Sequence, residues 1–156
     1  MSDELIFRLL KGGVFFLGMI PVPVADFLAG ALGRFWYRVD RRHRGITVEN
    51  LTSAYGGEWS QEKIERTARQ VFVNIAAILF EVAWSTRLSK KRLLSHFTIQ
   101  GMAHVTAAHA KGRGVVVITC HMGNFEMLIP VIDGTGFDGY AIYRTLDFAP
   151  LERLML

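Results

Sequence analysis

A histidine and a glutamate, five residues apart, form the arrangement in this 156-residue chain that best suits catalysis. They lie in the stretch His121-Met122-Gly123-Asn124-Phe125-Glu126, directly after an apolar run. Gly123 and Asn124 permit a tight turn, which can fold Glu126 back toward His121. A carboxylate hydrogen-bonded to one ring nitrogen fixes the tautomer and makes the other nitrogen a better proton acceptor. The pair therefore predicts a general base that deprotonates an alcohol for attack on an acyl carbonyl. The alternative is a structural histidine.

Other chemistry finds less support in the residues. Cys120 precedes His121, but neighbours on an extended strand point to opposite faces, so we expect Cys120 to be a small buried residue rather than a nucleophile. No Gly-x-Ser-x-Gly, phosphate loop or Gly-x-Gly-x-x-Gly turn occurs in the sequence. His104 and His109 are five residues apart on one expected helix, a spacing that does not suit binding of one metal ion by both, and no third ligand is evident. We expect no metal and no cofactor, and the remaining histidines are interpreted as surface or helix residues (His43, His96, His104, His109).

The elements around the motif follow an alternating order. Ser60 is a good N-cap for a long amphipathic helix that ends near Ser85, and further helices are expected over 102–111 and 124–132. Short strands are expected over 97–99, 115–119 and 140–143, the second of them a β-branched run typical of a strand buried on both faces. This order predicts an α/β fold with a mostly parallel sheet, flanking helices and His121 at the carboxyl edge of the sheet. The sheet is expected to be incomplete.

The N-terminal part is apolar and then basic. No charged residue occurs from Gly12 to Ala25, and Pro21 and Pro23 interrupt this run, which predicts two short helices joined by a bend. A cluster of arginines follows, opposed by Asp40 alone (Arg34, Arg38, Arg41, Arg42, Arg44). Basic residues beside an apolar segment favour the cytoplasmic leaflet, so we expect contact with a membrane surface. The same cluster opposes translocation, so we expect no signal-peptide cleavage at Ala29-Gly30-Ala31.

Composition agrees with a folded, membrane-associated chain. Hydrophobic residues make up 51% and charged residues 21%, which excludes a disordered chain, and the mean hydropathy is +0.25. One cysteine excludes an internal disulfide. The net charge of +4 also admits a nucleic-acid binder, but the apolar N-terminus speaks against it, so no nucleic-acid partner is predicted. We expect residues 1–44 to form the membrane-associated segment and 45–156 to belong to the α/β domain.

The hexamer at 121–126 resembles the His-x4-Asp/Glu motif of the lysophospholipid acyltransferase superfamily, and more narrowly that of the bacterial lipid A biosynthesis (lauroyl and myristoyl) acyltransferases. Further similar pieces come in the same order along nearly the whole chain: Arg44 to Leu51, the helix with Phe72, Asn74 and Glu81, Ile99-Gln100-Gly101, and Tyr143-Arg144. Phe125 stands where the family has a tryptophan. Family members are longer, so the chain is similar to an N-terminal portion of them.

The resemblance implies an acyltransferase of lipopolysaccharide synthesis on the cytoplasmic face of the inner membrane. It would move a fatty acyl group from acyl carrier protein or acyl-CoA to a hydroxyl of a lipid A precursor. His121 would be the general base and Glu126 its charge partner, Gly123 and Asn124 would shape the turn, and Arg144 would lie near the acceptor's charged headgroup. Two alternatives stay open: a non-catalytic membrane-surface binding module, or an acyltransferase that acts on a glycerophospholipid.

Overall fold

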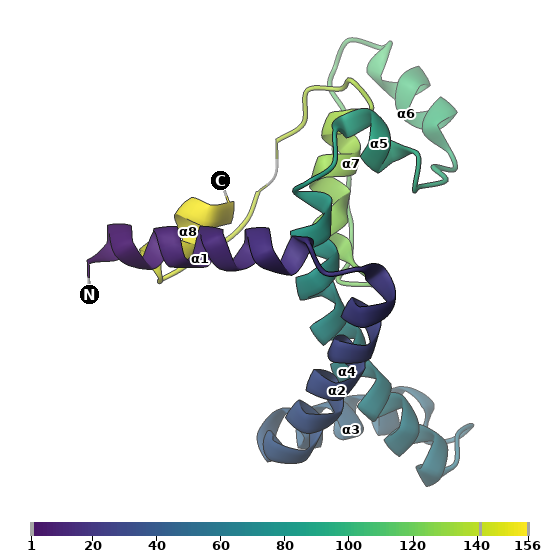
Figure 1. The fold of residues 1–156 in the computed structure, drawn as a ribbon. Coiled ribbons are helices and arrows are strands. Elements are labelled where there is room, and N and C mark those ends of the chain that lie inside the picture. The colour runs from purple at the N-terminus through teal and green to yellow at the C-terminus, as the bar shows by residue number, and fades with distance from the viewer. Residues whose placement is uncertain (1, 141, 156) are drawn as a thin grey trace. The chain divides into compact units, whose positions relative to one another are not determined.

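A computed structural model describes residues 2–140 and 142–155 of the chain, and the regular elements in these ranges are all helices (Figure 1). Two compact units are distinguished: residues up to Arg87 together with those from Tyr143 onward, and the segment Leu88–Ile142. The elements of the first unit are α1 (Asp3–Gly18), α2 (Val22–Val39), α3 (Arg41–Tyr55), α4 (Gln61–Ser85) and α8 (Ala149–Met155). The second unit contains α5 (Lys90–Leu94), α6 (Met102–His109), the 3-10 turn η1 (Phe125–Met127) and α7 (Leu128–Gly134).

The expected break between two N-terminal helices is confirmed. α1 ends at Gly18, and α2 begins after Pro21, which is its N-cap residue, with Pro23 in its first turn. Proline fits there because the first residues of a helix have no intrahelical use for an N–H group. The two helices are bent by 118° relative to each other.

By length and composition, α4 is apolar enough to cross a membrane, and α1 with α2 passes the same test as a bent pair. The core helix of a water-soluble domain also satisfies this criterion, so it supports a membrane location only weakly. α4 is also the helix that carries most of the buried hydrophobic residues of its unit.

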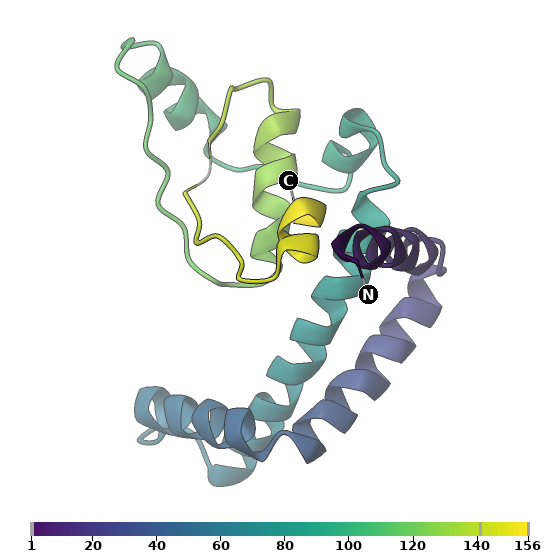
Figure 2. The same ribbon diagram turned by 90° about the vertical axis from the view of Figure 1, so that its left-hand side faces the viewer.

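The core of the first unit lies between α2 and α4, which run side by side (Figure 2). One cluster combines Ala29 with Ala76 and Phe80, and the other combines Tyr37 with Ala68 and Phe72. Gly33 is where the backbones meet, because a Cβ atom there would lie 2.4 Å from Val73 Cα. The absence of a side chain at this position therefore sets how closely α2 approaches α4.

The long amphipathic helix is confirmed as α4. Its N-cap is Ser60, whose hydroxyl accepts a hydrogen bond from the Lys63 N–H at 3.3 Å. Its buried residues recur at three- and four-residue steps, which places them on one face of a helix (Ile64, Ala68, Phe72, Ala76, Phe80, Ala83). Phe72, at 2% exposure, contacts the rings of Trp36 and Tyr37 edge-to-face.

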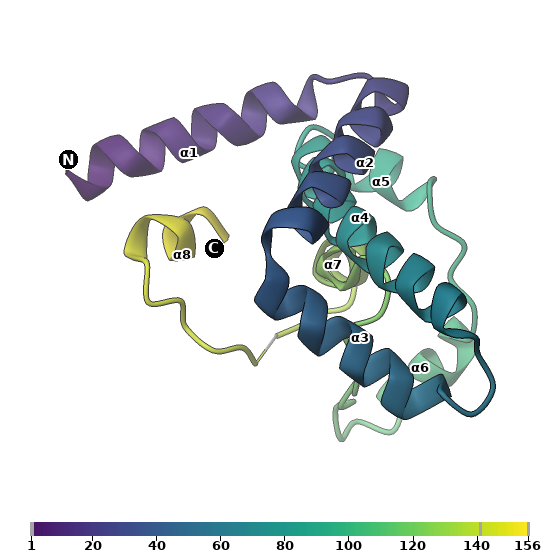
Figure 3. The same ribbon diagram turned by 90° about the horizontal axis from the view of Figure 1, so that it is seen from below.

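Asp40 separates α2 from α3, whose axes take different directions (Figure 3). Its carboxylate accepts hydrogen bonds from the His43 backbone N–H at 3.0 Å, from Trp36 Nε1 at 3.0 Å and from His43 Nδ1 at 2.7 Å. These donors, the backbone N–H of His43 foremost, lower the pKa of Asp40 from 3.8 to about 2. Asp40 is thus a charged cap at the start of α3.

α8 is attached to α1 within the first unit. Arg153 pairs with Glu4 at 2.6 Å, and its guanidinium lies 4.0 Å from the centre of the Phe7 ring. Hydrogen bonds from Arg153 and Arg8 lower the pKa of Glu4. This contact joins residues 149 positions apart in the sequence.

The predicted α/β fold is wrong: within 2–140 and 142–155 no β-strand is formed. Segments 97–99 and 115–119, both expected to be strands, are non-helical chain, and so are the described residues of 140–143, of which Ala141 lies outside the described residues. A strand needs a neighbour to hydrogen-bond its N–H and C=O groups, and these segments have none among the described residues. Val116 and Ile118 are accordingly 89% and 92% exposed. The helices expected after Met102 and after Asn124 are present as α6 and as η1 with α7.

Candidate active site

The His121–Glu126 motif forms a turn between non-helical chain and a short helix. Gly123 adopts φ +60°, a left-handed conformation that glycine reaches without strain. Asn124 then precedes η1, which contains Glu126 and leads directly into α7. α7 contacts α5, and Lys90 pairs with Asp133 at 2.6 Å within the same unit. The turn that the sequence predicts at Gly123 is therefore present. The helical segment that follows it buries Met127 and Val131.

His121 is exposed, and its ring lies against Phe125, with ring centroids 4.4 Å apart and an interplanar angle of 63°. Glu126 is half-buried. No hydrogen bond or ion pair joins these two side chains in the structure, so the expected orientation of the imidazole by Glu126 is not formed. Phe125, which the sequence marked only as an aromatic member of the motif, is instead the side chain in contact with the imidazole. An edge-to-face contact fixes a ring's tilt without specifying its tautomer.

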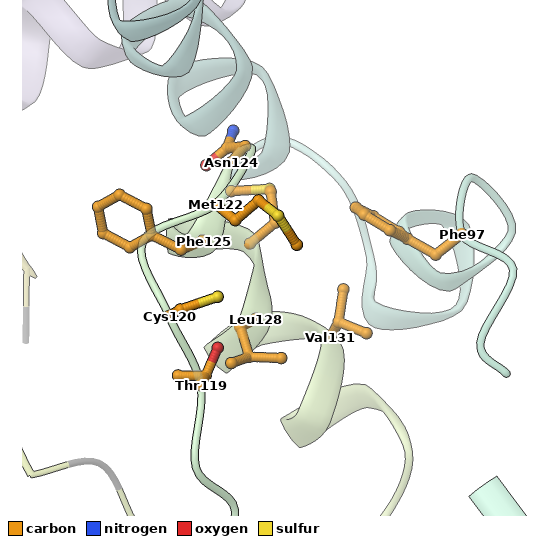
Figure 4. Close-up of a pocket in the computed structure, with 9 residues that line it drawn as sticks. Phe97, Thr119, Cys120, Met122, Asn124, Phe125, Leu128 and Val131 are labelled. Atoms are coloured by element: carbon orange, nitrogen blue, oxygen red, sulfur yellow. The ribbon is translucent and has the colours of Figure 1, made fainter. Parts of the chain in front are cut away.

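A mostly apolar cavity of about 230 Å³ adjoins the motif. Cys120 and Met122 of the non-helical segment and Leu128 and Val131 of α7 face it, and Phe97 closes its far side (Figure 4). Asn124 lies at its edge. Cys120 is exposed, so its prediction as a buried residue is wrong. The reason is that the sheet in which it was expected to be buried is not formed. The hydrophobic lining at Phe97, Leu128 and Val131 was not foreseen, since Phe97 is about 30 residues before the other two in the sequence.

Arg144, the fifth predicted site residue, belongs to the other unit. Its guanidinium pairs with Asp147 at 3.4 Å, and its side chain is 87% exposed. Beside it, Tyr143 donates a hydrogen bond to Glu152 at 2.7 Å, which raises the pKa of Tyr143. The structure thus gathers His121, Gly123, Asn124 and Glu126 in one turn, and it describes Arg144 in a separate body.

No group of three metal-ligating side chains is found in the part of the chain that the structure describes. An exposed imidazole in the same turn as a carboxylate, with an apolar cavity beside that turn, is suited to proton transfer next to a hydrophobic substrate.

Comparison with known proteins identifies the family. The model of the bacterial lipid A biosynthesis acyltransferases matches residues 2–156. A lipid A biosynthesis acyltransferase from Haemophilus influenzae is 25% identical over 112 residues, which are 70% of this chain and 35% of that protein. No solved structure is significantly similar to the chain.

The chain belongs to the bacterial lipid A biosynthesis acyltransferase family. This confirms the resemblance drawn from the hexamer and its surroundings. The chain spans about a third of the length of the curated relative that it matches.

Proposed function

We propose that the chain carries the proton-transfer motif of an O-acyltransferase, with His121 as general base and Glu126 as its charge partner. Family membership supports the reaction class, and the observation that carries the assignment is the turn itself. His121 and Glu126 flank a left-handed Gly123 beside an apolar cavity of about 230 Å³. The cavity, lined by the neighbours of His121 in the sequence, Cys120 and Met122, suits a hydrocarbon chain, and the imidazole itself is exposed and open to a second substrate.

The proposed step transfers an acyl group from a thioester, carried by acyl carrier protein or coenzyme A, to a hydroxyl of a lipid A precursor. A ring nitrogen of His121 takes the hydroxyl proton as the oxygen attacks the thioester carbonyl. The tetrahedral intermediate then expels the thiolate, which takes the proton back from His121. Glu126 stabilises the positive imidazolium that exists between these two events.

This mechanism requires the imidazole to turn from Phe125 toward Glu126. Because His121 is exposed, nothing buried has to be repacked for that movement. Gly123 and Asn124 act as positioning residues for it, and Arg144 is proposed to bind the charged headgroup of the acceptor.

The test is acyl transfer from acyl carrier protein to a lipid A precursor by the chain and its variants. His121→Ala is expected to lower turnover by about 10²–10⁴-fold. Glu126→Gln should lower turnover as well and also shift its pH profile, because the imidazole loses its charge partner. His104→Ala, which removes an exposed histidine of α6, is the matched control and should transfer normally. Undiminished turnover in His121→Ala would refute the role of this residue.

A second candidate is a membrane-surface binding module without transfer activity. It is favoured by the exposed apolar residues of α1 and α2, which include Phe16 at 68% and Phe27 at 69% exposure, followed by the arginines up to Arg44. We propose the cytoplasmic face of the inner membrane as the location for either function, because basic residues beside an apolar segment favour that side. Vesicle binding by a wild-type chain that transfers no acyl group would select this candidate.

A further inference from the structure

A second cavity, about 230 Å³ in volume, lies in the first unit between α2 and α4. Its lining combines three arginines with one tyrosine: Arg34, Tyr37 and Arg38 from α2, and Arg69 from α4. We call it the arginine cavity. Positions 34 and 38 are one helical turn apart, so their side chains leave α2 on the same side.

The charges in the arginine cavity are not neutralised by the chain. None of its three arginines forms an ion pair with a carboxylate in the described ranges. The carboxylate of Glu65 accepts a hydrogen bond from the hydroxyl of the lining residue Tyr37 at 2.6 Å. The ring of Tyr37 makes cation–π contacts with two guanidinium groups: Arg69 Cζ lies 5.4 Å and Arg44 Cζ 5.6 Å from its centroid.

The side chain of Arg34 lies along α2 next to Gly30. A Cβ atom on Gly30 would lie 3.0 Å from Arg34 Nη1, so the guanidinium folds back along the helix over a position without a side chain. The side chains of three arginines thus line one small space. Guanidinium forks match the oxygens of a phosphate and bind it by paired hydrogen bonds. Because the cavity is small and open at the surface, a single phosphate group suits it better than a large anion.

The surroundings indicate what carries the phosphate. Phe27, Ala31, Arg34 and Arg38 follow one another along a single side of α2, at steps of four, three and four residues. Phe27 is 69% exposed, and Phe35, next to Arg34, is 60% exposed. Phosphate and hydrocarbon adjoin in the same order at the surface of a lipid layer, where aromatic and basic side chains are favoured together. A soluble phosphate compound would leave this apolar surface without a partner.

We infer that the arginine cavity binds the phosphate of a lipid headgroup while the apolar side of α2 contacts the acyl chains. Binding at this site does not depend on acyl transfer, since the cavity lies in the unit that lacks the His121 motif. The two properties are therefore measured separately, and His121→Ala is expected to bind lipid as the wild type does.

The test is co-sedimentation of the full chain with phosphatidylcholine vesicles that contain phosphatidate, or oleate at the same surface charge. R34Q/R38Q is expected to weaken binding to phosphatidate vesicles by about tenfold or more, because it removes two of the three guanidinium groups that would hydrogen-bond the phosphate. R41Q/R42Q is the matched control: it removes two exposed arginines of the same basic segment outside the cavity and should cost about threefold or less. On oleate vesicles the two double variants should be alike.

A second pair of variants tests the cavity from α4. R69Q should weaken binding to phosphatidate vesicles, and R66Q, three residues earlier on the same helix and exposed, should leave it unchanged. Circular dichroism confirms that each variant is folded. Equal losses in R34Q/R38Q and R41Q/R42Q, or in R69Q and R66Q, would overturn the proposal in favour of diffuse charge attraction. Competition by inorganic phosphate without any preference for phosphatidate vesicles would overturn the lipid as its source.

Discussion

The contact of Gly33 with α4 allows a sharp test of how the first unit is held together. In Gly33→Ala the new Cβ atom would lie 2.4 Å from Val73 Cα, 2.6 Å from Val73 N and 2.7 Å from Phe72 O. All three are backbone atoms, so no side-chain rotation relieves the clash. The helices must separate by about 1 Å before the closest contact reaches the ordinary van der Waals range that begins at 3.4 Å.

Two opposing effects decide whether Gly33→Ala raises or lowers the free energy of unfolding. Alanine in place of glycine favours a helix by about 1 kcal/mol. Overpacking of a tight interface costs about 1–3 kcal/mol, and occasionally more. The clash is with backbone next to Phe72 and Tyr37, which are both buried, so we expect an overpacking cost at or above the upper end of this range. The free energy of unfolding should then fall by about 2 kcal/mol. In a chain of this size that corresponds to a fall in Tm of roughly 4–8 °C.

The assay is thermal and urea unfolding in mild detergent, followed by far-ultraviolet circular dichroism. Gly12→Ala is the matched control, because a Cβ atom at this helical position meets nothing within 4 Å. It makes the same chemical change, and we expect it to raise stability by about 0.5–1 kcal/mol through backbone entropy alone. If Gly33→Ala were as stable as the wild type, close backbone contact between α2 and α4 would not be what positions these helices.

Two further predictions concern a helix cap and the motif turn. The pKa of Asp40 is lowered from 3.8 in the unfolded chain to about 2, so its stabilising effect is complete above pH 4 and lost as the pH falls toward 2. Asp40→Asn should therefore be less stable than the wild type at neutral pH, with a difference in unfolding midpoint that shrinks at acid pH; a constant difference would contradict the charged cap. Gly123→Ala places a side chain at φ +60°, at a cost of about 1–2 kcal/mol. Acyl transfer should fall while vesicle binding stays normal, and wild-type transfer would show that the turn does not position His121.

The helices could be predicted from sequence because their signals are local. Ser60 marks the start of α4, its apolar residues repeat on one face, and Pro21 separates α1 from α2. Each of these depends on residues within a few positions of one another. The absence of strands could not be predicted from sequence. Val116 and Ile118 form β-structure only if another segment supplies the hydrogen bonds, and the described chain holds no such neighbour.

The candidate site divides in the same way. Its turn was predictable, because Gly123 and Asn124 favour it by their own backbone preferences. The orientation of His121 was not, since its ring rests on Phe125 instead of the carboxylate of Glu126. Arg69 could not be associated with the arginines of α2 from sequence either, because their meeting depends on how closely α2 and α4 approach.

The bend between α1 and α2 has a mechanical consequence for a lipid layer. At 1.5 Å per residue the arms are about 24 Å and 27 Å long, and neither matches a hydrocarbon thickness of about 30 Å. If α1 and α2 insert into a membrane as proposed, a pair of helices bent by 118° would occupy one monolayer and widen it without widening the other. Membrane curvature reduces the strain of such asymmetric insertion. A bilayer that already curves toward the protein would therefore accommodate the bent pair at the least elastic cost.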